Sequence, residues 1–132
     1  MKYLLAFISP DVLHRVKDAV ILRHIHGLSV SEARGFGQEH EVGHPEYREI
    51  PGVELTKKMR LEIVCHDDEV ERVLQAIYSA AHTGHAGDGK VFVLPVIDVL
   101  RLKTGERGPS ALGSPFRREG ATDLQHQQDT PP

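Results

Sequence analysis

The order of strand-like and helix-like patterns along the chain is the feature that most constrains its fold. An apolar run at residues 2–9 stops at Pro10, residues 11–26 carry apolar side chains near helical spacing, and residues 28–36 form a second strand-like run. The same order returns with strand alternation at residues 59–66, a helical apolar stripe at residues 68–81 and a strand at residues 91–94. A short further strand is expected at residues 99–102. The element order is therefore βαββαβ.

This order predicts an α+β fold, a ferredoxin-like sandwich in which two helices cover one face of an antiparallel sheet. With 132 residues, the chain has the size of a single domain. Gly27 stands where it could cap the first helix, and Asp68 with Glu71 resembles a capping box for the second. The side chains of the second strand that we expect to face inward are Leu28, Val30, Ala33 and Phe36.

Between the two halves lies a polar stretch at about residues 37–56 that contains proline and glycine and has no apolar period. It is too long for a hairpin turn. Long loops in compact domains are usually functional, so we expect a mobile functional loop here.

A second segment, residues 83–93 (TGHAGDGKVFV), crowds three glycines into the turn that leads to the 91–94 strand. Glycines at a turn let backbone N–H groups point into a concave space, and Lys90 adds a positive charge at the junction. An anion such as phosphate would suit this arrangement. The alternative is a tight helix-to-strand turn whose lysine is simply solvated.

Composition narrows the function classes. The net charge of −3 and the absence of a basic stripe interleaved with aromatics argue against a nucleic-acid binder. A single cysteine, Cys65, excludes a disulfide within the chain, fits a reducing cytoplasm and is expected to be a small core residue rather than a catalytic thiol. The N-terminal apolar run has one lysine and is broken by Pro10, so it predicts neither a secretory signal nor a membrane span. We therefore expect a soluble, cytoplasmic protein that does not insert into membranes.

Four blocks together resemble the PII signalling proteins. They are residues 27–37 (GLSVSEARGFG), 60–64 (RLEIV), 83–93 and 101–106 (RLKTGE), and their spacing resembles that of the family over residues 1–112. The remaining residues, 113–132, are polar and end in two prolines, which predicts a disordered tail. A tail folded onto the assembled protein is the alternative.

The resemblance implies a homotrimer that binds ATP or ADP in the clefts between subunits. It places the glycines around Phe36 near the phosphates and Lys90 on the opposite wall, where it would pair a phosphate. Arg101 and Lys103 of a neighbouring subunit would grip the phosphate chain, although a lysine keeps the charge of the family's arginine without its bidentate fork. An ordinary exposed strand face is the alternative for these two residues. The implied nucleotide-binding residues, of which Ser29, Glu62 and Val64 would lie near the adenine, are Ser29, Gly35, Phe36, Gly37, Gln38, Glu62, Val64, Gly87, Asp88, Gly89, Lys90, Arg101 and Lys103.

The sequence departs from the family in the long loop, which corresponds to the family's T-loop. Gln38-Glu39 replaces the family's Arg-Gln, whose glutamine helps to hold the Mg²⁺ that presents 2-oxoglutarate. The Glu39 carboxylate could ligate Mg²⁺ but would repel 2-oxoglutarate, so we expect that ligand to bind weakly or not at all. Lys58 stands at the position that pairs 2-oxoglutarate, with simple solvation as its alternative. The family's modified tyrosine falls at Pro51, which makes uridylylation doubtful.

Histidine is frequent, with nine copies, and we expect His40, His44 and His66 to lie in or near the loop. His40 and His44 with the neighbouring carboxylates could form a borderline metal site, although solvated histidines are the more ordinary interpretation.

The leading hypothesis is a non-catalytic regulator in which nucleotide biases the loop, and the loop docks on a transporter or an enzyme. The alternatives are a metal- or bicarbonate-responsive regulator linked to a membrane transporter, a metal-binding trimer without a nucleotide role, and a slow nucleotide phosphatase. No nucleophile–base constellation appears in these motifs to support the phosphatase.

Overall fold

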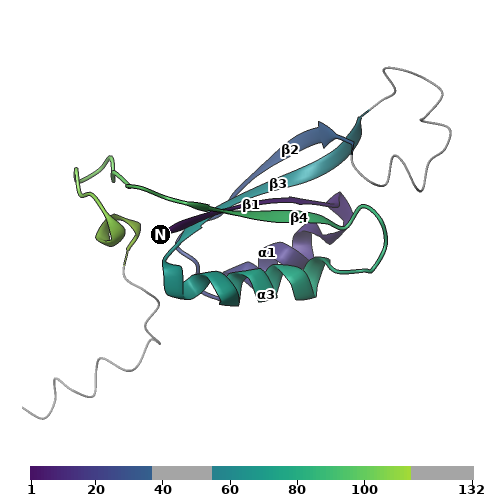
Figure 1. Ribbon diagram of the computed structural model, residues 1–132, viewed down its shortest axis with the longest axis horizontal. Coiled ribbons are helices and arrows are strands. Elements are labelled where there is room, and N and C mark those ends of the chain that lie inside the picture. Colours follow the sequence, from purple (N-terminus) through teal and green to yellow (C-terminus); the bar gives the residue numbers. More distant parts are fainter. Residues whose placement is uncertain (37–54, 114–132) are drawn as a thin grey trace, which may run out of the picture.

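The computed structural model describes residues 1–36 and 55–113, which form one four-stranded antiparallel sheet with two helices on one face (Figure 1). The strands lie in the order β2-β3-β1-β4. This is the βαββαβ-derived, ferredoxin-like arrangement that the sequence predicts. The elements are β1 (Lys2–Ile8), a 3₁₀ turn η1 (Pro10–Val12), α1 (Leu13–Ile21), β2 (Ser29–Gly35), β3 (Thr56–Cys65), a 3₁₀ turn η3 (Asp67–Glu69), α3 (Val70–Ala81), β4 (Gly89–Pro95) and a 3₁₀ turn η4 (Pro109–Leu112).

Strand β1 is one of the two inner strands of the sheet, since it pairs with β3 on one side and with β4 on the other. Its even-numbered side chains from Leu4 to Ile8 are buried against the helices, and the odd-numbered ones are only half-buried. The matching residues of β3, Leu61 and Ile63, are buried in the same layer. The alternation in the sequence therefore sets which face of each strand meets the helices.

Helices α1 and α3 pack on each other and on this face of the sheet (Figure 1). Their apolar stripes, spaced three and four residues apart, supply Val16 and Val20 from α1 and Val73 and Ile77 from α3. Cys65 is fully buried in the same core, as the sequence predicts for a small core residue. In the described part of the chain, no helix is both long and apolar enough to span a bilayer.

The helix ends differ from the sequence prediction. Helix α1 ends at Ile21 rather than near His26, and Gly27 does not cap it. The backbone N–H groups of Leu22, Arg23 and His24 close the last turn, and His24 takes a left-handed conformation (φ 55°) that stops the helix.

The capping box also lies elsewhere. The chain makes the 3₁₀ turn η3 before α3 begins, so the reciprocal contacts join His66 and Glu69 instead of Asp68 and Glu71. The Glu69 side chain accepts a hydrogen bond from the His66 N–H at 3.0 Å.

Two predictions about strands are wrong. Val30 and Phe36 are exposed rather than buried: Val30 lies on the same face as its buried partner Leu61, but β2 is an edge strand that the two helices leave partly uncovered. Residues 99–102 form no strand; only Leu100 makes an isolated bridge, to Arg107. The chain reverses there through a turn closed by Gly105 N–H on the Arg101 carbonyl, with Gly105 at φ 75°.

Candidate functional site

The glycine-rich turn between α3 and β4 has a backbone that only glycine adopts easily. Gly84, Gly87 and Gly89 have φ of 84°, 95° and 100°. At Gly89 a Cβ atom would lie 1.8 Å from the Phe7 carbonyl oxygen of β1. Glycine is therefore favoured at all three positions by the backbone conformation, and at Gly89 it is also required by the close approach of β1.

Asp88 holds this turn together from inside. Its carboxylate accepts hydrogen bonds from the N–H groups of Thr83 at 2.7 Å and Gly84 at 2.9 Å, and from the Thr83 hydroxyl. These bonds, first of all the one from the Thr83 side chain, lower the pKa of Asp88 to about 2. The sequence comparison with the family placed Asp88 among the nucleotide contacts; in the structure its carboxylate is engaged with the turn itself.

A hollow of about 450 Å³ opens between this turn, the end of β2 and the adjoining parts of β1, β3 and β4. This is within the usual size range of small-molecule sites. Among the charged side chains that line it, Arg34, Lys58 and Lys90 are basic and Asp88 alone is acidic, which leaves two positive charges in excess. The predicted residues that the structure brings together here are Gly35, Phe36, Lys58, Gly87, Asp88, Gly89 and Lys90.

Lys58 connects two walls of this hollow. Its Nζ donates a hydrogen bond to the Gly87 carbonyl at 3.0 Å, so a strand on one side is tied to the glycine-rich turn on the other. The alternative of a merely solvated lysine is therefore wrong. Arg34 was not singled out from the sequence; its place two residues before Phe36 on β2 is the signal that could have indicated it.

The residues expected near an adenine are not among those that line this hollow. Ser29 and Glu62 are register partners near the far end of the β2–β3 pair, and Val64 lies two residues beyond Glu62. The Glu62 carboxylate accepts a hydrogen bond from the Tyr3 hydroxyl at 2.5 Å, which is the main reason why the pKa of Tyr3 is raised. Glu62 also lies 3.1 Å from Arg60 Nε.

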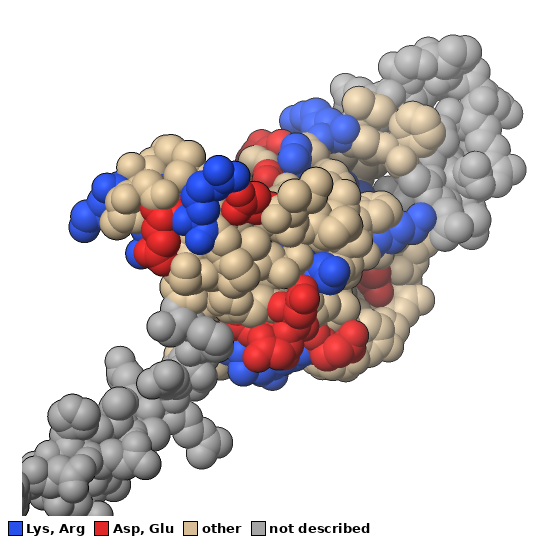
Figure 2. All heavy atoms as spheres, turned by 60° about the vertical axis from the view of Figure 1, so that its left-hand side comes forward, with Lys and Arg blue, Asp and Glu red and all other residues tan. Residues whose placement is uncertain are grey.

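The segment after β4 that contains Arg101 and Lys103 lies at the other end of the molecule from the turn between α3 and β4 (Figure 1). Figure 2 shows Lys and Arg side chains together with Asp and Glu side chains on the lobe that residues 96–113, the C-terminal segment, form. Arg101 Nε donates to the Ala111 carbonyl at 3.2 Å, and Lys103 is exposed. One chain therefore presents a basic glycine-rich hollow at one end and Arg101 and Lys103 at the other, and it cannot bring the two together by itself.

Some predicted residues lie outside the described residues: Gly37, Gln38, Glu39, His40 and His44, together with the loop positions around Pro51 and the tail. His66, by contrast, is described, and the prediction that it lies near the loop is wrong. It follows the end of β3 opposite the loop, so the ten-residue strand separates it from that loop by roughly 30 Å.

The chain is similar throughout most of its length to proteins of one family. The family model described as "Nitrogen regulatory protein P-II" matches residues 1–106. The "Nitrogen regulatory protein P-II" of Azospirillum brasilense is 46% identical over 114 residues, which covers 85% of this chain and 100% of that protein. The "Nitrogen regulatory protein P-II 1" of Methanothermobacter thermautotrophicus is 43% identical over 113 residues, covering 85% of this chain and 97% of that protein. The "Nitrogen regulatory protein P-II" of Rhodospirillum rubrum is 42% identical over 114 residues, covering 85% of this chain and all of the relative. The chain therefore belongs to the nitrogen regulatory protein P-II family of signalling proteins.

Proposed function

We propose that this protein is a homotrimeric, cytoplasmic signal-transduction protein that binds ADP or ATP between its subunits and is not an enzyme. The observation that carries this proposal is the division of the basic residues between two ends of the chain. Lys58 and Lys90 stand in a glycine-lined hollow at one end, and Arg101 and Lys103 stand on a segment at the other. A neighbouring subunit would supply the second set, so that a phosphate chain meets cations from both sides.

Bound nucleotide would act on the segment of residues 37–56, because that segment joins β2 to β3 at the rim of the hollow. Phe36, which directly precedes this segment, and Lys58, two residues after it, both line the hollow. The ligand would shift the populations of this segment, which then docks on a partner transporter or enzyme. Mg²⁺ held by Glu39 could accompany ATP, and weak or absent 2-oxoglutarate binding is expected from the same carboxylate. The alternatives of a bicarbonate-responsive regulator and of a phosphatase receive no support from the comparisons.

Calorimetry with ADP and ATP on the full chain tests the proposal. Lys90→Ala should weaken nucleotide binding by about 1.5–3 kcal/mol, the range for hydrogen bonds to charged groups. Lys17→Ala is the matched control, since Lys17 is a partly exposed lysine on α1 and does not line the hollow. Equal affinities for the two variants, or no binding of either nucleotide by the unmodified protein, would refute the proposal.

A further inference from the structure

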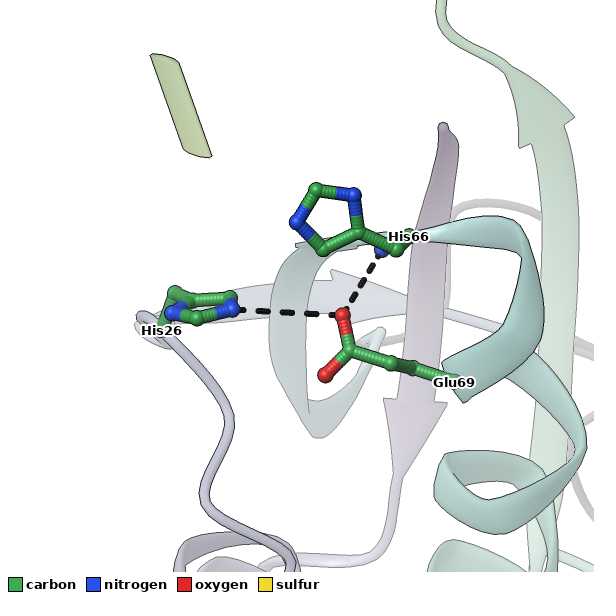
Figure 3. A group of neighbouring side chains, drawn as sticks. All are labelled: His26, His66 and Glu69. Atoms are coloured by element: carbon green, nitrogen blue, oxygen red, sulfur yellow. Dashed lines mark hydrogen bonds and ion pairs between the residues drawn. The ribbon is translucent and has the colours of Figure 1, made fainter. Parts of the chain in front are cut away.

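Three side chains from two segments far apart in the sequence converge at the end of the domain that lies away from the glycine-rich turn (Figure 3). His26 comes from the connection between α1 and β2, His66 follows β3, and Glu69 closes η3. Each offers one ligand atom, and these atoms all lie within 4.8 Å of one another. The sequence does not suggest this cluster, because 40 positions separate His26 from His66 in the printed sequence.

Glu69 makes this cluster unusual, because it is the one charged residue that is buried among the described residues, with 2% of its surface exposed. Burying a carboxylate is costly unless it is paired and hydrogen-bonded. One oxygen, Oε2, accepts from Arg72 at 3.2 Å; the other, Oε1, accepts from the His66 N–H at 3.0 Å and faces His26 Nε2 at 3.9 Å. Arg72 and the backbone thus hold the carboxylate in place while Oε1 stays turned toward His26.

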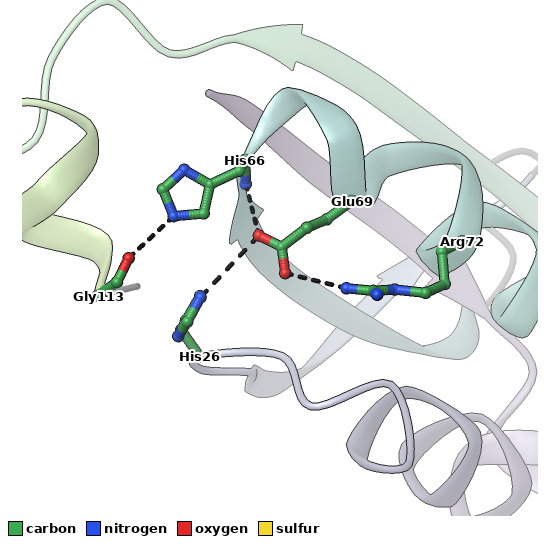
Figure 4. A network of polar contacts seen from close by, with 5 residues as sticks. All are labelled: His26, His66, Glu69, Arg72 and Gly113. Atoms are coloured by element: carbon green, nitrogen blue, oxygen red, sulfur yellow. Dashed lines mark hydrogen bonds and ion pairs between the residues drawn. The ribbon is translucent and has the colours of Figure 1, made fainter. Parts of the chain in front are cut away.

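The two imidazoles are held at an angle to each other, with ring centroids 5.7 Å apart and planes at 87°. The Nε2 atom of His66 lies 3.0 Å from the Gly113 carbonyl oxygen, which reaches the cluster from the C-terminal segment (Figure 4). The side chain of His26 is 22% exposed, so solvent can reach the cluster from its side. Two imidazole nitrogens and a carboxylate oxygen are therefore fixed on a partly open site, with a backbone carbonyl oxygen beside them.

The three donor atoms determine which kind of metal ion the cluster can bind. Imidazole suits zinc, copper and nickel, whereas magnesium and calcium prefer sites built from oxygen alone. Two histidines with one glutamate form a known three-ligand set for zinc that leaves a further position open. With bonds of about 2.0–2.1 Å in a tetrahedral site, ligand atoms stand roughly 3.3 Å apart, so these donors need only a modest contraction.

We propose that His26, His66 and Glu69 form a binding site for one divalent transition metal ion of the kind that Zn²⁺ represents. Binding requires neutral imidazoles, so the metal ion would take the place of the proton that His66 Nε2 donates to the Gly113 carbonyl, and the ring would carry its one proton on Nδ1. The metal ion would join the α1–β2 connection to the start of α3. Because metal on His66 Nε2 would remove the proton that joins it to the Gly113 carbonyl, binding would break that hydrogen bond and free Gly113 from His66.

The test uses the full chain without a histidine tag and without nucleotide. Zn²⁺ is titrated by calorimetry, and Co²⁺ serves as a second probe whose visible absorption reports a low-coordinate nitrogen and oxygen site. We expect one Zn²⁺ per chain, and we expect His26→Gln and His66→Gln each to weaken binding at least tenfold. His14→Gln is the matched control, because His14 is an exposed histidine on α1 outside the cluster; it should leave Zn²⁺ affinity unchanged.

A double variant, His40→Gln with His44→Gln, separates this site from the histidines of the long loop. If Zn²⁺ binding is lost in that double variant and kept in His26→Gln and His66→Gln, the proposal is wrong. Absence of Zn²⁺ binding by the unmodified chain overturns it as well. Glu69→Gln alone is a poor test, because a buried capping residue also stabilises the start of α3; the two histidine variants therefore decide.

Discussion

Gly89 shows at the scale of one residue how the turn and the sheet depend on each other. Any Cβ at this position would clash with the Phe7 carbonyl, and its φ of 100° is itself strained for other residues. Gly89→Ala should therefore lower the free energy of unfolding by about 1–3 kcal/mol or more. It should also weaken nucleotide binding, because the turn must move. Chemical denaturation measures the first effect and calorimetry the second.

Gly27→Ala is the control for this prediction. Gly27 has no positive φ and no atom within 4 Å of a built Cβ, so alanine should change the stability by less than about 0.5 kcal/mol. Equal stabilities of the two variants would contradict the steric argument.

Asp88 gives a prediction about pH at the same scale. Its pKa in the folded protein is about 2, below the value of about 3.9 for an unfolded aspartate. The folded state therefore favours the ionised carboxylate, and its contribution to stability is complete above about pH 4 and is lost as the pH falls toward 2. Asp88→Asn should be less stable than the unmodified protein at pH 7, and this difference should shrink between pH 4 and pH 2. Denaturation curves at a series of pH values would show it; a difference that stays constant or grows on acidification would contradict the assignment.

At the scale of elements, the sequence predicts a strand or helix well where one apolar period runs through the whole element, as in β3 and α3. The alternation and the helical stripe match the buried sides of both elements. The ends are harder, because they depend on local turns. A left-handed His24 stops α1 five residues earlier than the apolar pattern suggests, and η3 moves the capping box to His66 and Glu69. No period encodes these choices.

Strand β3 offers a chemical test through Cys65. The thiol is fully buried, and burial raises its pKa to about 11. At pH 8 the folded protein would then hold roughly two hundred times less thiolate than an unfolded cysteine with a pKa of about 8.5. We expect a thiol reagent to label the native protein far more slowly than the same protein in guanidinium chloride.

The same raised pKa has a consequence for stability. The folded state keeps the thiol proton that the unfolded state loses. The stability that the protonated thiol contributes is therefore complete below about pH 8.5 and declines as the pH rises toward 11.

In the labelling experiment, modification of the native protein at a rate close to that in denaturant would show that β3 does not bury this thiol.

At the scale of the whole molecule, the sequence places residues in elements but does not say which side chains converge. The glycines and Lys90 in the sequence suggest a turn that is suited to binding phosphate. The sequence does not suggest the hydrogen bond from Lys58 to Gly87, nor the cluster of His26, His66 and Glu69, because residues from distant segments meet only once the sheet has formed. The resemblance to a family supplies Arg101 and Lys103, which lie on a segment at the opposite end of one chain and do not line its hollow.

The apolar side chains that this chain leaves uncovered predict its assembly. Ile97 and Leu102, in the C-terminal segment, are 99% and 92% exposed, and Phe92 and Leu94 on β4 are also exposed. Clustered apolar exposure of this kind marks a surface that another protein covers. In a homotrimer, neighbouring subunits would cover it and would bring Arg101 and Lys103 to the glycine-rich hollow. Ile97→Asp should therefore dissociate the trimer and abolish nucleotide binding. Leu22→Asp, at an exposed leucine on the end of α1, should do neither.

Sedimentation velocity and circular dichroism on the same samples separate assembly from folding. If the protein were a monomer, Ile97→Asp would change its free energy of unfolding by less than about 0.5 kcal/mol, because nothing in the described residues packs over that side chain. We expect the unmodified protein to sediment as three chains, and Ile97→Asp to sediment as one chain that keeps its secondary structure. A variant that remains trimeric and binds nucleotide normally would show that this surface is not where the subunits meet. Arg101 and Lys103 of a neighbouring subunit would then have to reach the hollow through a different subunit interface.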